Sequence, residues 1–504
     1  MERRRWTRGP FGLLVVIIGM ASLVVAPRVE SARQGTPEAS ALRTVACPFA
    51  AEVAPFDVEC GLLVVPEDRS MPAGNMIALS VVTVRNPNPE AAAEPVLYLE
   101  GGPGIGAFGA IVPLLNSDAG SRLVAERDLI VLDQRGTGYS VPRLDCTLFT
   151  PDRLTDTDRY LASTASCFDR FTGAGVGLGS YTTVAIAADA RDLRLSLGLD
   201  EWNVYGVSYG TTIALELLRR DPSGTRALVL DSPSPPQSNE ILDDVRYKAA
   251  ALEKVFAECA ADPGCGERHP DLEVRFGAAI EALNAGPLDL GDVRVTGDFL
   301  VFVLTNTAFF TGDLIPRLPD LIDGALSGDV VPLADLLSGV GATDDGTGAE
   351  TAAFVASDKL FLAVTCAEEA PRTSQAELGA LAATGPVAAS LARTAATLVA
   401  GCASWDVPPV DPDALSAVSS DAPVLILVGE WDPSTPLALA AETATTLPNA
   451  RIVEFPGQAH GVVGAATTAC PFELMASFWV EPSAPVDRGC VDADYASISF
   501  AIEE

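Results

Sequence analysis

The sequence contains one serine in a setting that could make it a nucleophile. Residues 206–210 read G-x-S-x-G around Ser208, after a strand-like run at 202–205 and before a helix-like run at 211–218. A tight turn between a strand and a helix holds a serine hydroxyl above the edge of a parallel sheet. Because a serine hydroxyl reacts only when a base removes its proton, the motif requires a base elsewhere in the chain.

Histidine is the usual base, and the chain has only two, His269 and His460. His460 follows one apolar, strand-like run, and Asp432 follows the run before it. Because the carboxyl ends of parallel strands share one sheet edge, both side chains can meet Ser208 there. The chain order serine, acid, histidine is that of a known catalytic triad. We predict that Ser208 attacks, His460 transfers the proton and Asp432 orients the imidazole.

Two residues compete for these roles. Glu430 shares a loop with Asp432, but the Asp-Pro turn and the greater distance past the strand favour Asp432. His269 lies in a cysteine-flanked turn, where we expect a structural role.

A tetrahedral intermediate also needs hydrogen-bond donors for its oxyanion. One candidate is the backbone N–H of Tyr209, the residue after the nucleophile. The second is expected from residues 100–104, E-G-G-P-G, where glycines let the backbone approach a substrate closely. Since the proline of this loop has no N–H, Gly102 is our choice, with Gly101 and Gly104 as alternatives.

The glycine loop also contains a competing motif. Residues 104–109 read G-x-G-x-x-G after a strand, and Asp133 ends a later strand, as in dinucleotide-binding turns. Asp133 lies further along than the roughly 20 residues typical of a ribose-binding acid. The motif also leaves the serine–acid–histidine order unexplained. A dinucleotide-binding oxidoreductase is therefore the remote alternative, and we expect no cofactor.

Composition describes an acidic globular protein. Of 504 residues, 48% are hydrophobic and 20% are charged, as in chains with a large core. The 67 acidic and 33 basic residues give a net charge of −34, which repels phosphate backbones. We therefore expect no nucleic-acid partner.

The first 35 residues resemble an addressing segment. Four arginines within the first eight residues precede the apolar or small stretch 11–26, and a small-residue pair at 31–32 could be cleaved. This is the pattern of an export signal, and the stretch is short for a spanning helix of about 20 residues. We expect residues 1–35 to be removed on export, the alternative being an uncleaved membrane anchor on a cell-surface protein.

Ten cysteines agree with an oxidising compartment. A metal site is not expected, because no C-x-x-C pair is present and histidine is scarce. The simplest disulfide connectivity joins neighbours along the chain: Cys47–Cys60, Cys146–Cys167, Cys259–Cys265, Cys366–Cys402 and Cys470–Cys490.

Apolar runs alternate with helical patterns, which predicts a doubly wound, mostly parallel α/β sheet with an inserted helical region. The expected strands are 61–66, 77–85, 95–99, 129–132, 202–205, 227–230, 424–428 and 451–455. The expected organisation is a linker at 36–45, a first core part at 46–235, a mainly helical insertion at 236–400 and a second core part at 401–504.

Together these motifs resemble the proline iminopeptidase family of α/β-hydrolase serine peptidases, and more closely its exported tripeptidyl-aminopeptidase-like branch. The similarity covers about residues 45–495. The features that carry it are G-G-P-G at 101–104, D-Q-R-G-T-G-Y-S at 133–140, G-V-S-Y-G at 206–210, C-G-L-L-V-V-P-E-D at 60–68, T-C-A-E at 365–368, and the late Asp432 and His460.

The resemblance implies hydrolysis of peptide substrates from a free N-terminus, with the insertion as a cap over the site. Recognition of the α-ammonium group calls for carboxylates, and the candidates are Glu368 and Glu369 in the insertion and Glu100 beside the glycine loop. Glu100 departs from the family, which often has histidine or a neutral polar residue there. Asp133 and Arg135 are expected to brace the loop. The main alternative is an esterase on small carboxylic esters, since the same triad cleaves either bond.

Overall fold

The computed structural model describes residues 41–47, 55–88, 94–117, 120–146, 155–290, 293–309, 312, 314–327 and 358–500. These ranges belong to one compact unit, Ala39–Glu504. The expected addressing segment 1–35 lies outside the described residues. Within the described ranges, no helix has the length and apolar composition needed to cross a bilayer.

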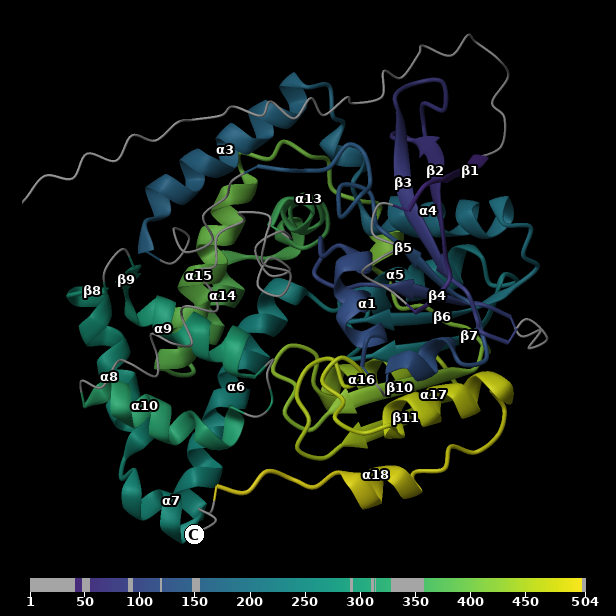
Figure 1. Cartoon of the computed structure of the whole chain (residues 1–504). Helices are drawn as coiled ribbons and strands as arrows, with labels where there is room; N and C mark the ends of the chain where they lie inside the picture. Colours follow the sequence, from purple (N-terminus) through teal and green to yellow (C-terminus); the bar gives the residue numbers. More distant parts are fainter. Residues whose placement is uncertain are drawn as a thin grey trace, which may run out of the picture. The chain divides into compact units, whose positions relative to one another are not determined.

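A nine-stranded sheet positions the site (Figure 1), in the order β1-β2-β3-β5-β4-β6-β7-β10-β11. The pairs from β5 to β11 are parallel, whereas β1, β2, β3 and β5 pair antiparallel in succession. The expected α/β-hydrolase fold is thus confirmed. The strands are β1 Ala41–Val45, β2 Val58–Pro66, β3 Met76–Val84, β4 Val96–Leu99, β5 Leu129–Leu132, β6 Trp202–Val207, β7 Thr225–Asp231, β10 Val424–Gly429 and β11 Ala450–Phe455.

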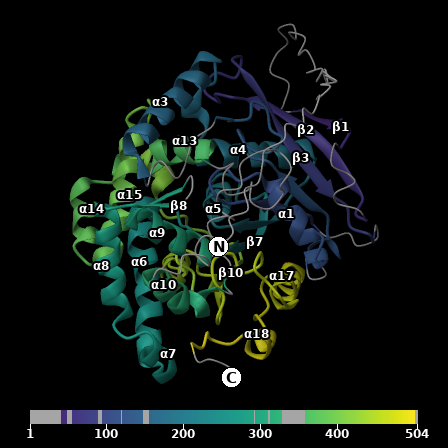
Figure 2. The same ribbon diagram turned by 60° about the vertical axis from the view of Figure 1, so that its left-hand side comes forward.

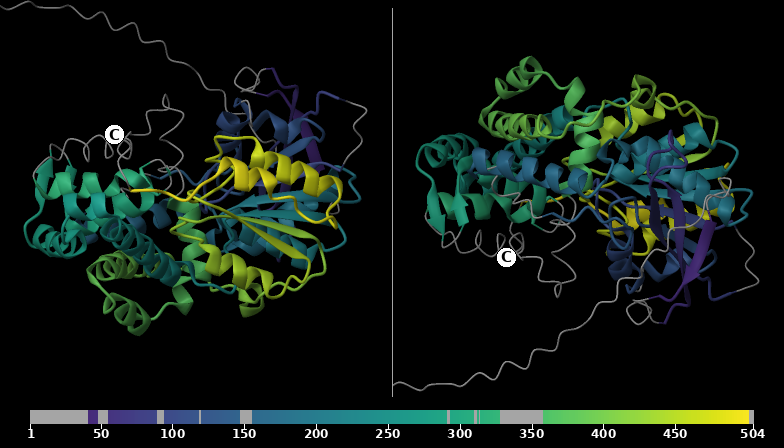
Figure 3. Two further views of the ribbon diagram at one scale, coloured as in Figure 1. Left: turned by 90° about the horizontal axis from the view of Figure 1, so that it is seen from below. Right: turned by 90° about the horizontal axis from the view of Figure 1, so that it is seen from above.

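Helices cover both faces of this sheet (Figure 3). Val96 and Tyr98 of β4 pack in the cluster of α1 and α17, while Leu97 and Leu99 pack on the other face with α4 and α5. Burial on both faces explains why the central strands are continuous apolar runs. The covering helices are α1 Ala107–Leu115, α4 Thr183–Ser196, α5 Tyr209–Arg220, α16 Leu437–Ala444 and α17 Cys470–Val480.

A second group of helices lies beside the sheet (Figures 1 and 2). Most of it comes from the region where the sequence predicts helices, although a hairpin of two short strands, β8 Leu288–Leu290 and β9 Val293–Val295, was not expected. The helices are α3 Thr157–Gly173, α6 Glu240–Ala261, α7 Pro263–Arg268, α8 Leu272–Ala285, α9 Gly297–Val303, α10 Leu318–Leu326, α13 Asp358–Glu368, α14 Gln375–Ala382 and α15 Pro386–Cys402.

Part of the expected linker is structured. Residues 41–45 form β1, which pairs with β2 along its open edge. Leu42 covers Gly61 of β2, where a Cβ would approach Leu42 Cδ1 to 2.8 Å. The missing side chain at Gly61 provides the space that Leu42 fills, a contact that local composition does not reveal.

All five disulfide pairings expected from the sequence are present. Cys146–Cys167 attaches the segment after β5 to α3, and Cys366–Cys402 joins α13 to α15. Neighbours along the chain pair here because each bridge connects segments that pack together locally.

Candidate active site

Ser208 lies in the sharp turn between β6 and α5, with the left-handed φ of 53°. Its N–H donates to the carbonyl of Asp231 on β7 at 2.9 Å. The motif glycines permit this turn: a Cβ on Gly206 would come within 2.5 Å of the Gly210 carbonyl oxygen, and one on Gly210 within 2.1 Å of the Leu99 carbonyl oxygen. The turn therefore has the close packing of a nucleophile elbow.

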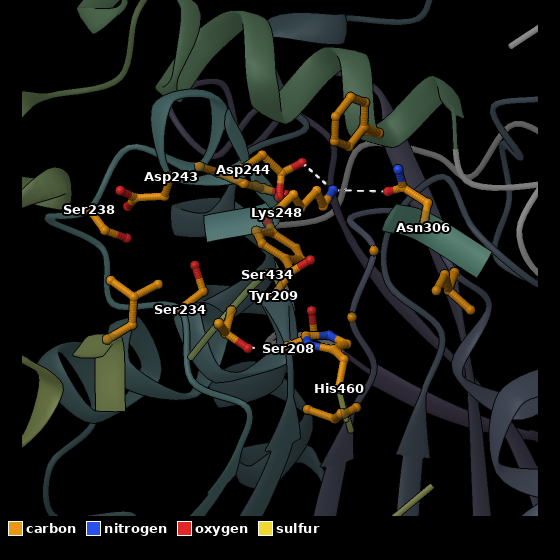
Figure 4. A pocket seen from close by; sticks show the side chains of 18 of the residues that line it. Ser208, Tyr209, Ser234, Ser238, Asp243, Asp244, Lys248, Asn306, Ser434 and His460 are labelled. Atoms are coloured by element: carbon orange, nitrogen blue, oxygen red, sulfur yellow. Dashed lines mark hydrogen bonds and ion pairs between the residues drawn. The ribbon is translucent and has the colours of Figure 1, made fainter. Parts of the chain in front are cut away.

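A cavity of about 310 Å³ lies over this turn. Ser208 and His460 both line it and lie in the same part of it in Figure 4. Gly101 approaches from the glycine loop, since a Cβ there would be 2.8 Å from Ser208 Cβ. The structure thus brings together the serine, the histidine and the glycine loop that the sequence singled out.

Asp432 binds the ring of His460. The His460 Nδ1 atom lies 2.9 and 3.0 Å from the two carboxylate oxygens of Asp432. Thr435 donates its hydroxyl to Asp432 at 2.9 Å and its N–H at 2.8 Å. Glu430, the competing acid, accepts from the Lys254 ammonium at 3.3 Å and the Gly457 N–H at 2.8 Å. The geometry therefore favours Asp432 as the partner of the imidazole.

Burial and the charges of the two residues shift the pKa values of Asp432 and His460. Burial opposes the charged form of Asp432, but the charge and hydrogen bond of His460 outweigh it and lower the pKa of Asp432 to about 2. Burial also favours a neutral imidazole, yet Asp432 raises the pKa of His460 above its usual value. Asp432 therefore stays ionised at neutral pH, and His460 is a stronger base than a free imidazole.

Backbone donors are available beside Ser208. The Gly101 N–H is used by the Glu100 carboxylate at 2.7 Å. The N–H groups of Gly102 and Tyr209 have no hydrogen-bond partner among the described residues, and both residues line the cavity. Gly104 does not line it. This arrangement suits the predicted oxyanion donors.

The three predicted substrate carboxylates have different surroundings. Glu100 lines the cavity and accepts from the Tyr98 hydroxyl, and burial raises its pKa. Glu368 and Glu369 do not line this cavity. Glu368 accepts the N–H and hydroxyl of Thr183, both at 2.7 Å, while Glu369 pairs with an arginine. The two insertion carboxylates instead line a smaller adjoining pocket, which shares Tyr209, Ser234, Ser238 and Glu240 with this cavity.

The acidic wall of the cavity comes instead from the first turns of α6. Glu240, Asp243 and Asp244 line it, and all three were missed in the sequence. The available signal was the N-cap Asn239 followed by acidic residues, which also suits a helix N-terminus. Lys248, one turn further on, donates to Asp244 at 2.5 Å and to Asn306 at 2.9 Å (Figure 4).

The remaining sequence candidates are structural. Asp133 accepts the N–H groups of Phe108 and Tyr139 at 3.1 and 2.8 Å, so its buried carboxylate braces loops rather than facing a ribose. Arg135 forms two buried hydrogen bonds to the carboxylate of Asp189, at 2.8 and 2.7 Å. Both therefore act as the expected braces.

His269, as expected, joins two helices: its ring nitrogens lie 2.8 and 2.9 Å from Asp320 and Asp323 of α10. In the described part of the chain, no group of three or more histidine, cysteine or acidic residues could hold a metal ion.

Known protein families match two parts of this chain. The family model "alpha/beta hydrolase fold" matches residues 94–264, and the model "TAP-like protein" matches residues 388–490. The chain is 25% identical over 444 residues to the serine protease Hip1 of Mycobacterium tuberculosis, covering 80% of this chain and 82% of that protein. It is 26% identical over 447 residues to carboxylesterase B of the same organism, covering 80% and 81%.

A third relative is the tripeptidyl aminopeptidase of Streptomyces lividans, which is 26% identical over 439 residues and covers 81% of this chain and 79% of that protein. Among solved structures, the proline iminopeptidase of Mycobacterium smegmatis is 17% identical, with a TM-score of 0.41 and coverage of 84% and 98%. By the two family models, the chain contains an α/β-hydrolase-fold region at 94–264 and a TAP-like region at 388–490, and it is a serine hydrolase.

Proposed function

We propose that the protein is an exported aminopeptidase that releases short peptides or single residues from free N-termini. Ser208 attacks the scissile carbonyl, His460 takes the hydroxyl proton and passes it to the leaving amine, and Asp432 holds the imidazole. Water then attacks the acyl-enzyme with His460 as base. The carrying observation is that His460, bonded to Asp432, lines the same cavity as Ser208.

Among the described residues, the N–H groups of Gly102 and Tyr209 have no hydrogen-bond partner, which supports the oxyanion part of this proposal. Both are backbone donors on closely packed elements, so they need little reorganisation as charge develops on the carbonyl oxygen. The Gly101 N–H is already occupied by Glu100, which favours Gly102 over its neighbour.

The charge of the cavity supports a substrate with a free α-ammonium group. Four carboxylates line it, those of Glu100, Glu240, Asp243 and Asp244; Lys248 pairs with Asp244, and Arg246 pairs with Asp243. Burial, with Asp244 and Glu369 nearby, raises the pKa of Glu240 well above its usual value. A bound ammonium group would relieve this repulsion by pairing with the charged carboxylate. We assign ammonium recognition to α6 rather than to Glu368 and Glu369.

The helical insertion supplies part of the cavity lining. Phe302, Asn306 and Phe361 line the cavity from helices beside the sheet. We therefore assign residues 236–400 as a cap that restricts the site to a chain end.

The five disulfides support export, since such bridges persist in oxidising compartments. They agree with an export signal at residues 1–35. Signal removal would be checked by N-terminal sequencing of the secreted protein.

An esterase is the second candidate, favoured by the relative named carboxylesterase B. The deciding experiment compares p-nitroanilides of one to three residues, with free and with acetylated N-termini, alongside p-nitrophenyl butyrate. We expect rapid cleavage of the free peptides and poor cleavage of the acetylated ones. Cleavage of the ester alone would contradict the peptidase assignment, and Ser208→Ala is the control for nucleophile-dependent turnover.

A further inference from the structure

Two residues at the end of β7, Asp231 and Ser232, hold the loop that carries His460. The carboxylate oxygens of Asp231 accept the N–H groups of the second and third residues after His460, at 2.9 and 3.0 Å. The Ser232 hydroxyl accepts the N–H of the first, Gly461, at 2.9 Å. Three consecutive backbone donors after the histidine thus end on two neighbouring side chains.

The same pair contacts the elements of the other two proposed triad members. The backbone carbonyl of Asp231 accepts the Ser208 N–H at 2.9 Å. The Ser232 N–H donates at 2.8 Å to the carbonyl of Leu427 on β10, the strand that precedes the acid loop, and the Ser232 side chain helps to lower the pKa of Asp432. One dipeptide therefore connects the serine turn, the acid loop and the histidine loop.

The conformation and surroundings of these two residues cost folding free energy. Asp231 is fully buried, and its partners are backbone N–H groups and the Tyr205 hydroxyl at 3.2 Å. Ser232 is fully buried and has a φ of 57°, which a non-glycine residue rarely adopts. Buried charge and left-handed backbone persist where the surrounding structure requires them, and they often accompany functional sites.

We propose that Asp231 and Ser232 are positioning residues of the hydrolytic reaction, which fix the backbone of the histidine loop so that the imidazole faces Ser208. The inference rests on the proposed triad and not on the identity of the acyl substrate. A carboxylate can accept two N–H groups at once, whereas an amide would turn its NH₂ toward one of them. The proposed positioning role of Asp231 therefore requires its negative charge.

Asp231 also acts on His460 through space. Its charge, together with that of Asp432, raises the pKa of His460, while Lys248 lowers it. Among the described residues, Glu100 also faces His460, whose charge opposes the rise that burial causes in the pKa of Glu100. The hydroxyls of Tyr205 and Tyr98 face Asp231, whose own pKa burial raises to about 6. Removing the Asp231 charge should therefore make His460 easier to deprotonate. This response distinguishes a positioning role at the histidine from a purely structural one.

The test uses Asp231→Asn and Ser232→Gly, the latter because glycine tolerates the left-handed backbone while removing the hydroxyl. Each is measured for kcat, KM and pH profile on whichever substrate the wild type turns over, peptide or ester. We expect kcat to fall by about 100-fold in Asp231→Asn, with little change in KM. The acidic limb of the pH–rate profile of Asp231→Asn should move to lower pH. Ser232→Gly should lower kcat and leave the acidic limb where it is in the wild type.

Asp221→Asn is the matched control. Asp221 is also buried and hydrogen-bonded, to Arg194 at 2.7 Å, but it lies at the far end of α5 from Ser208. The control should lose stability while each folded molecule keeps its kcat. The proposal would be overturned if folded Asp231→Asn kept the kcat of the wild type. It would also be overturned if Asp221→Asn lost as much kcat as Asp231→Asn and the acidic limb of Asp231→Asn did not move. If Asp231→Asn does not fold, the test rests on Ser232→Gly, and an unchanged kcat in that variant would overturn the proposal.

A failure of the peptidase proposal would leave this test intact. If the wild type cleaves only esters, the substrate assignment is wrong, and the positioning role is then measured with an ester.

Discussion

The pKa of His460 depends on charges of both signs that reach it from different elements. Asp432 and Asp231 raise it from loops at the end of the sheet, and Lys248 lowers it from α6. Because the imidazole must be neutral to act as a base, its pKa sets the acidic limb of the pH–rate profile.

We therefore expect Lys248→Met to move the acidic limb of kcat/KM to higher pH, because loss of a nearby positive charge raises the pKa of His460. Lys254→Met is the matched control. Lys254 lies on the same helix, pairs with Glu430 and lies over the Trp431 ring, and it does not line the cavity. Equal limbs in the two variants would show that Lys248 does not act on the base.

The choice between two acids in one loop gives a second prediction at this scale. Asp432→Asn should lower kcat by about 10⁴-fold, because the imidazole loses the partner that orients and stabilises it. Glu430→Gln should keep kcat close to that of the wild type, since Glu430 bonds to Lys254 and Gly457. Steady-state kinetics on both folded variants decide the assignment, and the reverse ranking would exclude Asp432.

At the scale of elements, the end of α13 is attached to the start of α4. Glu368 accepts the N–H and hydroxyl of Thr183, whose hydroxyl also lies 2.8 Å from that of Tyr209. Burial, the largest cause, raises the pKa of Glu368 to about 7. This buried carboxyl connects an insertion helix to the residue after the proposed nucleophile.

The raised pKa predicts a pH dependence of stability. The folded state holds the proton of the Glu368 carboxyl more tightly than the unfolded chain does. The contribution of Glu368 to the free energy of unfolding is therefore complete below pH 4.5 and is lost as pH rises through about 7. Wild-type protein should lose up to roughly 3 kcal/mol relative to Glu368→Gln across this window. Urea unfolding at pH 5, 6, 7 and 8 measures the difference.

Glu377→Gln, which alters an exposed capping box on the neighbouring α14, is the control and should show no such loss over the same range. A pH-independent difference between wild type and Glu368→Gln would contradict the assignment.

At the scale of the whole molecule, the bridges differ in the length of chain that they close. Cys366–Cys402 spans 36 residues and Cys259–Cys265 spans 6. Because a longer loop loses more entropy on closure, removing the first pair as Cys366→Ser/Cys402→Ser should cost roughly 4 kcal/mol, against roughly 2 for Cys259→Ser/Cys265→Ser. Denaturant unfolding of both double variants measures this order. Equal stability of the two would show that loop length is not the main factor.

Prediction from the sequence was most successful where the residues that determine a structure lie close together along the chain. The turn at Ser208 needs glycines on both sides, and the strands between two helical layers need continuous apolar runs. Both signals are contained within a few residues. Edge pairing of residues 41–45 was missed because it depends on the open edge of β2 and on the space above Gly61.

The sequence alone determined the elbow and the scarcity of histidine that singles out His460, because each follows from residue type, count or short spacing. It favoured the neighbouring cystine pairs as the simplest connectivity, and the structure confirmed them. Only the tertiary structure decided which carboxylates line the cavity: α6 brings in Glu240, Asp243 and Asp244, while Glu368 and Glu369 line a smaller adjoining pocket. It also showed Asp231 and Ser232 under the histidine loop. The physical reason is that packing of helices and strand ends joins segments hundreds of residues apart, and no local pattern encodes which side of a helix meets the cavity.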